Sequence, residues 1–268
     1  MLELVVENTN KYIDSVSVNY SDHDTYKVKR TTLSEIKACI GLLYMVGVFK
    51  SNRQNLDDLW ANDETGMEIF RSAMSLQRFR FLLQCLRFDD RKTRAARSEV
   101  DKLAPIRQFF ELFVTKCKSH YSVGELVTID EKLEKFRGNC PFRQSIASKP
   151  GNYGIKIYAL VDSRIFYTQN LEIYAGKQPE GPYQLSNSPA DVVERMISPI
   201  SGSGRNVTVD NWFTSVPLAM KLLKDHNLTL LGTIRKNKKE IPPQLVQTKN
   251  KAVNTSIFCF RKEMTMVF

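Results

Sequence analysis

Two aspartates in the sequence lie where metal-dependent chemistry needs acidic side chains. Asp130 directly follows a β-branched run at residues 126–129, and Asp210 directly follows a similar run at residues 206–209. If the two runs form neighbouring parallel strands, both carboxylates emerge at one edge of the sheet. Carboxylate oxygens there suit Mg²⁺ or Mn²⁺, which also bind phosphate oxygens. Two such ions about 3.5–4 Å apart polarise the attacking and leaving oxygens of a phosphoryl displacement.

Each aspartate also has a purely structural interpretation. An aspartate after a strand commonly accepts hydrogen bonds from local amides in a turn, and for either residue taken alone this is the more frequent case. Other carboxylates nearby are interpreted as having no catalytic role, namely Glu131, Glu134, Asp162 and Asp191.

The first half of the chain has the pattern of helices. Residues 32–35 (TLSE) form a capping box, and residues 36–49 are apolar nearly all round, which predicts a buried helix. Ser75 and Pro105 mark the starts of two further helices. Residues 89–101 are polar and rich in arginine, and they predict a loop that is either simply solvated or in contact with phosphates.

Beyond Tyr121 the pattern becomes that of strands with interspersed helices. Residues 154–161 and 165–174 predict a hairpin, and helices are expected to start at Pro189 and Pro217. Short strands are expected at residues 206–209 and 228–234. This order predicts a mixed α/β sheet with helices packed on it. Trp212 and Phe213 could stack on a splayed base, but an aromatic residue after a strand more often packs in the core.

The charge balance favours a polyanionic partner. Lys and Arg number 39 against 29 Asp and Glu, which gives a net charge of +10, and neutralising nucleic-acid phosphates with such cations releases counterions. Two groups of basic residues are candidate DNA contacts, with solvated loops or strand ends as the competing interpretation. They are Arg137, Arg143, Lys149, Lys156, Arg235, Lys236, Lys238 and Lys239.

The sequence gives no support for a zinc ribbon or disulfide framework, for a histidine-based metal site, or for a P-loop nucleotide enzyme. The five cysteines form no C-x-x-C pair, the three histidines are far apart, and no phosphate-binding G-x-x-x-x-G-K-[ST] motif occurs. The longest apolar run, residues 38–49, is interrupted by glycines and too short to cross a bilayer, so no membrane partner is expected.

Longer motifs carry a resemblance to a known family. They are residues 128–131 (TIDE), 136–143 (FRGNCPFR), 153–156 (YGIK), 205–215 (RNVTVDNWFTS), 231–242 (LGTIRKNKKEIP) and 255–260 (TSIFCF). In this order they resemble the piggyBac family of DDE transposases, and the helical half fits through residues 86–90 (LRFDD).

The resemblance implies an RNase H-like catalytic core at residues 121–236. A helical dimerisation and DNA-binding region at residues 1–120 would precede it, and the start of a β-rich insertion at residues 237–268 would follow. It further implies nuclear cut-and-paste transposition through hairpinned ends into TTAA targets, with DNA, a second copy of the chain and divalent metal as partners. Asp130 and Asp210 correspond to the family's first two catalytic aspartates, which coordinate the metal.

The sequence departs from the family pattern in one respect. The family's third catalytic aspartate lies on a later helix, and nothing between Asp210 and Phe268 matches it. We therefore expect the chain to be truncated before that position, to bind metal weakly and to be catalytically incomplete. The alternatives are a domesticated, non-enzymatic DNA-binding or dimerising protein of transposon origin, and an unrelated nuclear scaffold that uses the helical half.

Overall fold

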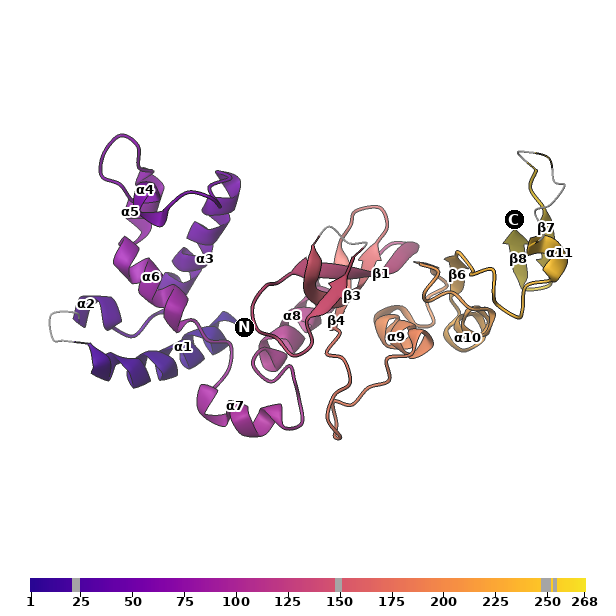
Figure 1. Cartoon of the computed structure of the whole chain (residues 1–268), viewed down its shortest axis with the longest axis horizontal. Helices are drawn as coiled ribbons and strands as arrows, with labels where there is room; N and C mark the ends of the chain where they lie inside the picture. The colour runs from indigo at the N-terminus through magenta and orange to yellow at the C-terminus, as the bar shows by residue number, and fades with distance from the viewer. Residues whose placement is uncertain (21–24, 148–150, 247–251, 253–254) are drawn as a thin grey trace. The chain divides into compact units, whose positions relative to one another are not determined.

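The chain folds into two compact units, each with its own hydrophobic core. The computed structural model describes residues 1–20, 25–147, 151–246, 252 and 255–268 (Figure 1). The first unit comprises Met1–Phe113 and Pro179–Tyr183, and the second comprises Val114–Gln178 and Gln184–Phe268. The domain boundaries at residues 121 and 237 stay predictions.

Helices dominate the first half of the described chain, in agreement with the sequence pattern. In chain order they are α1 (Leu2–Val16), a 3₁₀ turn (Ser17–Asn19), α2 (Thr25–Val28), α3 (Leu33–Val48), α4 (Leu56–Leu59), α5 (Glu68–Ala73), α6 (Leu76–Cys85), α7 (Arg91–Ser98) and α8 (Arg107–His120). The predicted caps are present: the side chain of Thr32 accepts from the amide of Glu35, and that of Ser75 accepts from the amide of Arg78.

The core of the first unit is aromatic and aliphatic. Trp60, Phe70 and Phe79 pack together with ring centroids 4.9–5.0 Å from Trp60, and Ile13 and Leu82 complete the cluster. Beside this core, the carboxylate of Glu35 does not close the capping box by reaching back to the amide of Thr32. It accepts instead from the hydroxyl of Thr31 and from the buried guanidinium of Arg78, which ties α3 to α6.

The prediction that residues 36–49 form a buried helix is only half correct. α3 buries Ile36, Cys39 and Leu42, but Tyr44 and Val48 are about 70% exposed (73% and 69%). Apolar residues all round a helix show that the helix is hydrophobic, but they do not show which of its faces are covered by other elements. Within the described residues, only one side of α3 is covered.

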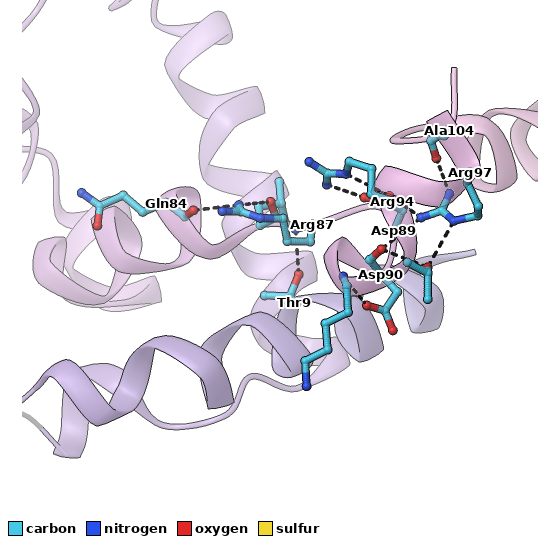
Figure 2. Close-up of polar contacts among 11 residues, drawn as sticks. Thr9, Gln84, Arg87, Asp89, Asp90, Arg94, Arg97 and Ala104 are labelled. Carbon is cyan, nitrogen blue, oxygen red and sulfur yellow. Dashed lines mark hydrogen bonds and ion pairs between the residues drawn. The ribbon is translucent and has the colours of Figure 1, made fainter. Parts of the chain in front are cut away.

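The prediction that residues 89–101 form a loop is wrong. They contain α7, whose first turn is capped by the side chain of Asp90 accepting from the amide of Lys92 at 2.9 Å. The buried carboxylate of Asp89 pairs with both Arg94 and Arg97, and Arg97 also donates to the carbonyl of Ala104 (Figure 2). Charge pairs across five and eight residues organise this segment. Hydrophobic periodicity does not detect such pairs.

The second unit is built on a mixed sheet, as predicted. Its strands are β1 (Leu126–Lys135), β2 (Gln144–Ile146), β3 (Asn152–Asp162), β4 (Thr168–Ile173), β5 (Asn206–Val209) and β6 (Thr229–Gly232). The order is β2-β3-β1-β5-β6, with β4 also paired to β3. β5 lies parallel to both β1 and β6, while the pairs that involve β3 are antiparallel, including the predicted hairpin with β4.

Helices cover this sheet. α9 (Pro189–Met196) contacts β3 and β4, and α10 (Val216–His226) contacts β6. Val192 and Val193 of α9 and Leu222 of α10 are fully buried in the core of the unit. Both helices start as predicted, with the side chain of the preceding serine accepting from a first-turn amide. A 3₁₀ turn (Ser198–Ile200), α11 (Pro243–Val246) and an antiparallel hairpin of β7 (Phe258–Arg261) and β8 (Met264–Val267) are the remaining elements described.

Among the helices that the structure describes, none has the length and apolar character needed to cross a bilayer.

Candidate active site

The candidate site lies where two parallel strands end side by side. β1 and β5 pair from Leu126 with Asn206 to Ile129 with Val209, so Asp130 and Asp210 are the next residues on the two strands. Ile129 and Val209 are buried, whereas both aspartates are exposed. Burial of the apolar residues fixes the register, because a slip by one residue would turn these side chains to the opposite face. The predicted parallel pairing of the two runs is thereby confirmed.

Three carboxylates converge at this strand end. Asp130, Glu131 and Asp210 each offer an oxygen, and these oxygens all lie within 4.8 Å of one another. The strand pattern indicates only the two aspartates as site residues, and a catalytic role for Glu131 is not among its predictions. Strand alternation directs Glu131 to the face opposite Asp130, so its approach depends on a longer side chain at the end of the pairing. The adjacency of the two residues was the only available signal.

Local hydrogen bonds hold both aspartates in place. Asp130 Oδ1 accepts from the amide of Glu131 at 2.7 Å, and Asp210 Oδ1 accepts from the amide of Asn211. The carbonyl of Asp210 accepts from the amides of Phe213 and Thr214, both at 3.1 Å, and from the Thr214 hydroxyl at 2.8 Å. The turn after β5 is thus closed on the aspartate itself, which limits how far its side chain can move.

The neighbouring strand β6 approaches this turn closely. Gly232 pairs with Val209, and a Cβ at Gly232 would lie 2.3 Å from the Thr214 hydroxyl and 2.9 Å from the Val209 carbonyl. Only glycine fits there without moving backbone next to Asp210.

Aromatic rings support the site from the core side. The rings of Trp212 and Tyr158 are stacked at 6.1 Å with an interplanar angle of 7°, and Phe213 is 1% exposed. The prediction that Trp212 and Phe213 pack in the core is confirmed. Burial, with smaller effects from Tyr174 and nearby carboxylates, raises the pKa of Tyr158, so its hydroxyl stays neutral.

Lys156 lies among these rings. Its Nζ is 4.7 Å from the ring centroid of Trp212 and 5.0 Å from that of Tyr158, distances at which an ammonium is attracted to an aromatic face. Lys156 is on the same face of β3 as Tyr158, which is the register partner of Glu131. A contact between Lys156 and DNA stays a prediction.

The other candidate DNA contacts are spread around the second unit. Arg143 donates to the carbonyls of Arg137 and Gly138, while the side chain of Arg137 is exposed. Arg235 donates to Asn211 Oδ1 at 3.2 Å, beside the turn that carries Asp210. Lys236 and Lys239 are exposed and Lys238 is half-buried. Lys149 lies outside the described residues.

The carboxylates fit a hard divalent cation. Three anionic oxygens within 4.8 Å repel one another, and such cations bind oxygen ligands and neutralise this charge. Since Asp130 and Asp210 are exposed, a phosphodiester has access to the same place. Divalent ions held by paired carboxylates can catalyse phosphoryl transfer.

A mixed sheet with flanking helices and acidic residues at neighbouring parallel strand ends is the arrangement expected of the catalytic fold of a DDE transposase. The chain belongs to this class: the family model described as Transposase IS4 matches residues 1–268. In particular, the structure is similar to a chain of the cryo-EM structure of piggyBac transposase in a synaptic complex with hairpin DNA. The TM-score is 0.90 and the identity 39% over 99% of this chain. This protein spans 55% of the length of that piggyBac transposase chain. The resemblance to the piggyBac family drawn from the motifs is confirmed.

Proposed function

We propose that the chain carries catalytic machinery of a piggyBac-type transposase that cuts and joins DNA by metal-dependent phosphoryl transfer. The observation that carries the proposal is the convergence of Asp130, Glu131 and Asp210 at the ends of two parallel strands. Membership of the transposase family supports the same reaction class.

In this proposal Asp130 and Asp210 are the residues that hold the divalent ion, which is Mg²⁺ or Mn²⁺. The bound ion supplies Lewis acidity to a phosphoryl oxygen and lowers the pKa of an attacking water. The protein's own part is to hold the two carboxylates at one strand end. The amides of Glu131 and Asn211 orient their oxygens. The half-buried Glu131 acts beside them as a supporting ligand or orienting group.

The proposed partner is DNA, and its support is the net charge of +10 and the basic residues around the site. Arg235 is the strongest candidate contact in the second unit, because it lies beside Asn211 in the turn that follows Asp210. The family resemblance extends the proposal to transposon ends, TTAA targets, a homodimer and a nuclear location.

The test is metal-dependent cleavage of a duplex that carries the transposon end. The proposal expects weak strand nicking with Mn²⁺, short of complete excision, that Asp130→Asn and Asp210→Asn each abolish. Asp225→Asn, which removes an exposed carboxylate from α10, is the matched control and is expected to cut normally. Nicking that survives both site substitutions would contradict the proposal. Binding of metal and duplex without any nicking would favour the non-enzymatic DNA-binding alternative.

A further inference from the structure

The first unit contains a cavity whose charged lining is entirely basic. The cavity has a volume of about 410 Å³ and lies where α6 leads into α7. Its lining consists of three arginines and three apolar residues, namely Leu86, Arg87, Phe88, Arg91, Arg94 and Pro105. A concave surface lined by three arginines and no acidic residue attracts an anion.

The three arginines differ in how much of their charge is already compensated. Arg94 pairs with the buried carboxylate of Asp89, so part of its role is to hold α7 in place (Figure 2). In the part of the chain that the structure describes, no carboxylate lies within salt-bridge distance of Arg87 or Arg91. The lining therefore keeps uncompensated positive charge at these two positions.

Arg87 is held in a fixed orientation without an acidic partner. Its Nη1 donates to the carbonyls of Gln84 at 2.9 Å and Leu86 at 2.7 Å, and its amide donates to the hydroxyl of Thr9 (Figure 2). The guanidinium carbon lies 3.7 Å from the ring centroid of Tyr12, and that of Arg91 lies 5.5 Å from the same ring. A guanidinium that is already immobilised loses little further freedom on binding, and its planar fork matches phosphate oxygens.

We propose that this cavity binds a phosphate group of the DNA backbone, with Arg87 and Arg91 as the contacting residues and Arg94 as a positioning residue. The proposal rests on the proposed function only in taking DNA as the partner. It adds a contact in the first unit, separate from the carboxylates of the second. Phosphate contacts position a protein on the duplex without reading its sequence, so the contribution of the cavity should be independent of base sequence.

The test compares duplex binding by the full chain and a double variant, Arg87→Gln with Arg91→Gln. Fluorescence anisotropy with a labelled duplex of arbitrary sequence is measured over a range of salt concentrations. The double variant is expected to bind roughly tenfold more weakly. The slope of log K against log salt is expected to become shallower by about 1.8, since each lost phosphate contact removes about 0.9.

Two controls separate this effect from net charge and misfolding. Lys50→Gln with Arg53→Gln removes the same charge from exposed positions of the same unit outside the cavity, and it should leave the slope nearly unchanged. The single Arg91→Gln variant changes an exposed side chain, so it should keep the wild-type melting temperature. Its slope of log K against log salt should change by about half as much as that of the double variant.

Three outcomes would overturn the inference. If the double variant binds with the wild-type affinity and slope, the cavity does not contact DNA. If Arg235→Gln then binds more weakly than the wild type, the proposed function still stands. Absence of duplex binding by the wild-type chain would remove both. Thermal stabilisation of the wild type by inorganic phosphate, lost in the double variant while duplex binding is kept, would assign the cavity to a small anion.

Discussion

At the scale of single residues, the three carboxylates at the end of β1 and β5 are not equivalent. Asp130 and Asp210 occupy corresponding positions on parallel strands and are exposed, whereas Glu131 is half-buried and its amide donates to Asp130. We therefore expect the aspartates to dominate metal affinity and Glu131 to act as their support.

This difference predicts a graded response to substitution. Glu131→Gln keeps the amide that donates to Asp130 but removes a carboxylate beside both aspartates, and it is expected to raise the Mn²⁺ dissociation constant by about tenfold. Asp130→Asn is expected to abolish measurable binding. Glu134→Gln is the matched control on the same strand, since Glu134 pairs with Lys132 at 2.8 Å. Calorimetric titration measures all three, and equal effects of Glu131→Gln and Glu134→Gln would contradict the supporting role.

Asp162 is a second acidic residue with a defined task, and it lies outside the candidate site. Its carboxylate accepts from the amides of Gly124, Ile165 and Arg164, and these bonds lower its pKa to about 2. The group closes the turn after β3, and the absence of a catalytic role for Asp162 stays a prediction.

A depressed carboxyl pKa makes stability depend on pH in one direction. Protonation favours the unfolded chain, in which the pKa of Asp162 returns to about 3.8. The stabilisation is present above pH 4 or so and is lost as the pH falls through about 2. Denaturant unfolding followed between these values should show a steeper loss for the wild type than for Asp162→Asn. Parallel curves for the two proteins would refute this assignment.

At the scale of elements, α3 and α6 are joined by a charge pair in the core of the first unit. Arg78 is 2% exposed, and it donates to both carboxylate oxygens of Glu35 and to the carbonyls of Lys27 and Lys29. Removing the buried cation leaves the half-buried carboxylate of Glu35 and two carbonyls without their donor, which is costly.

Arg78→Met should therefore lower the free energy of unfolding by about 3–5 kcal/mol. The same helix supplies the control: Arg80 pairs with Asp57 at the surface, and Arg80→Met should cost under about 1 kcal/mol. Urea unfolding of the two variants makes the comparison. Similar losses would show that the buried pair contributes no more than the exposed one.

The elements that the sequence predicted best are those set by local signals. The serine and proline caps of α6, α9 and α10, the hairpin of β3 and β4, and the parallel runs β1 and β5 follow from residue type and alternation. α7 was missed because Asp89 and Asp101 bind arginines five and six residues further along the chain, and the spacing of such charge pairs has no fixed period. The exposed side of α3 could not be foreseen, because apolar content does not reveal which faces have neighbours. At the site, the matching strand ends indicate the two aspartates. The approach of Glu131 could not be predicted, because strand alternation directs its side chain to the opposite face.

At the scale of the whole molecule, charge is the property that supports the proposed DNA partner, and the two units differ in it. The net charge of +10 falls on the second unit, with 22 Lys and Arg against 12 Asp and Glu, while the first unit is balanced at 17 against 17. The arginine-lined cavity is a local concentration of positive charge within that balanced unit. Binding that depends on such cations must weaken with salt, because released counterions drive it.

Association of the full chain with duplex DNA should therefore show a linear fall of log K with log salt. We expect a slope of about −0.9 for each phosphate neutralised, and little dependence on base sequence for this part of the affinity. Filter binding with a terminal-repeat duplex and a scrambled duplex provides the data. Affinity that is insensitive to salt would instead favour the nuclear scaffold, which uses the helical half to bind a protein.

The central claim is that Asp130 and Asp210 jointly hold one divalent ion, and a Mn²⁺ titration followed by electron paramagnetic resonance tests it most directly. The free ion gives a six-line signal that disappears on binding, so the number of ions held is counted without any need for DNA cleavage. The account predicts that Asp130→Asn, Asp210→Asn and the double variant all lose the same ion, since either aspartate alone holds it poorly. Retention of that ion by both single variants would show that the two carboxylates do not share it.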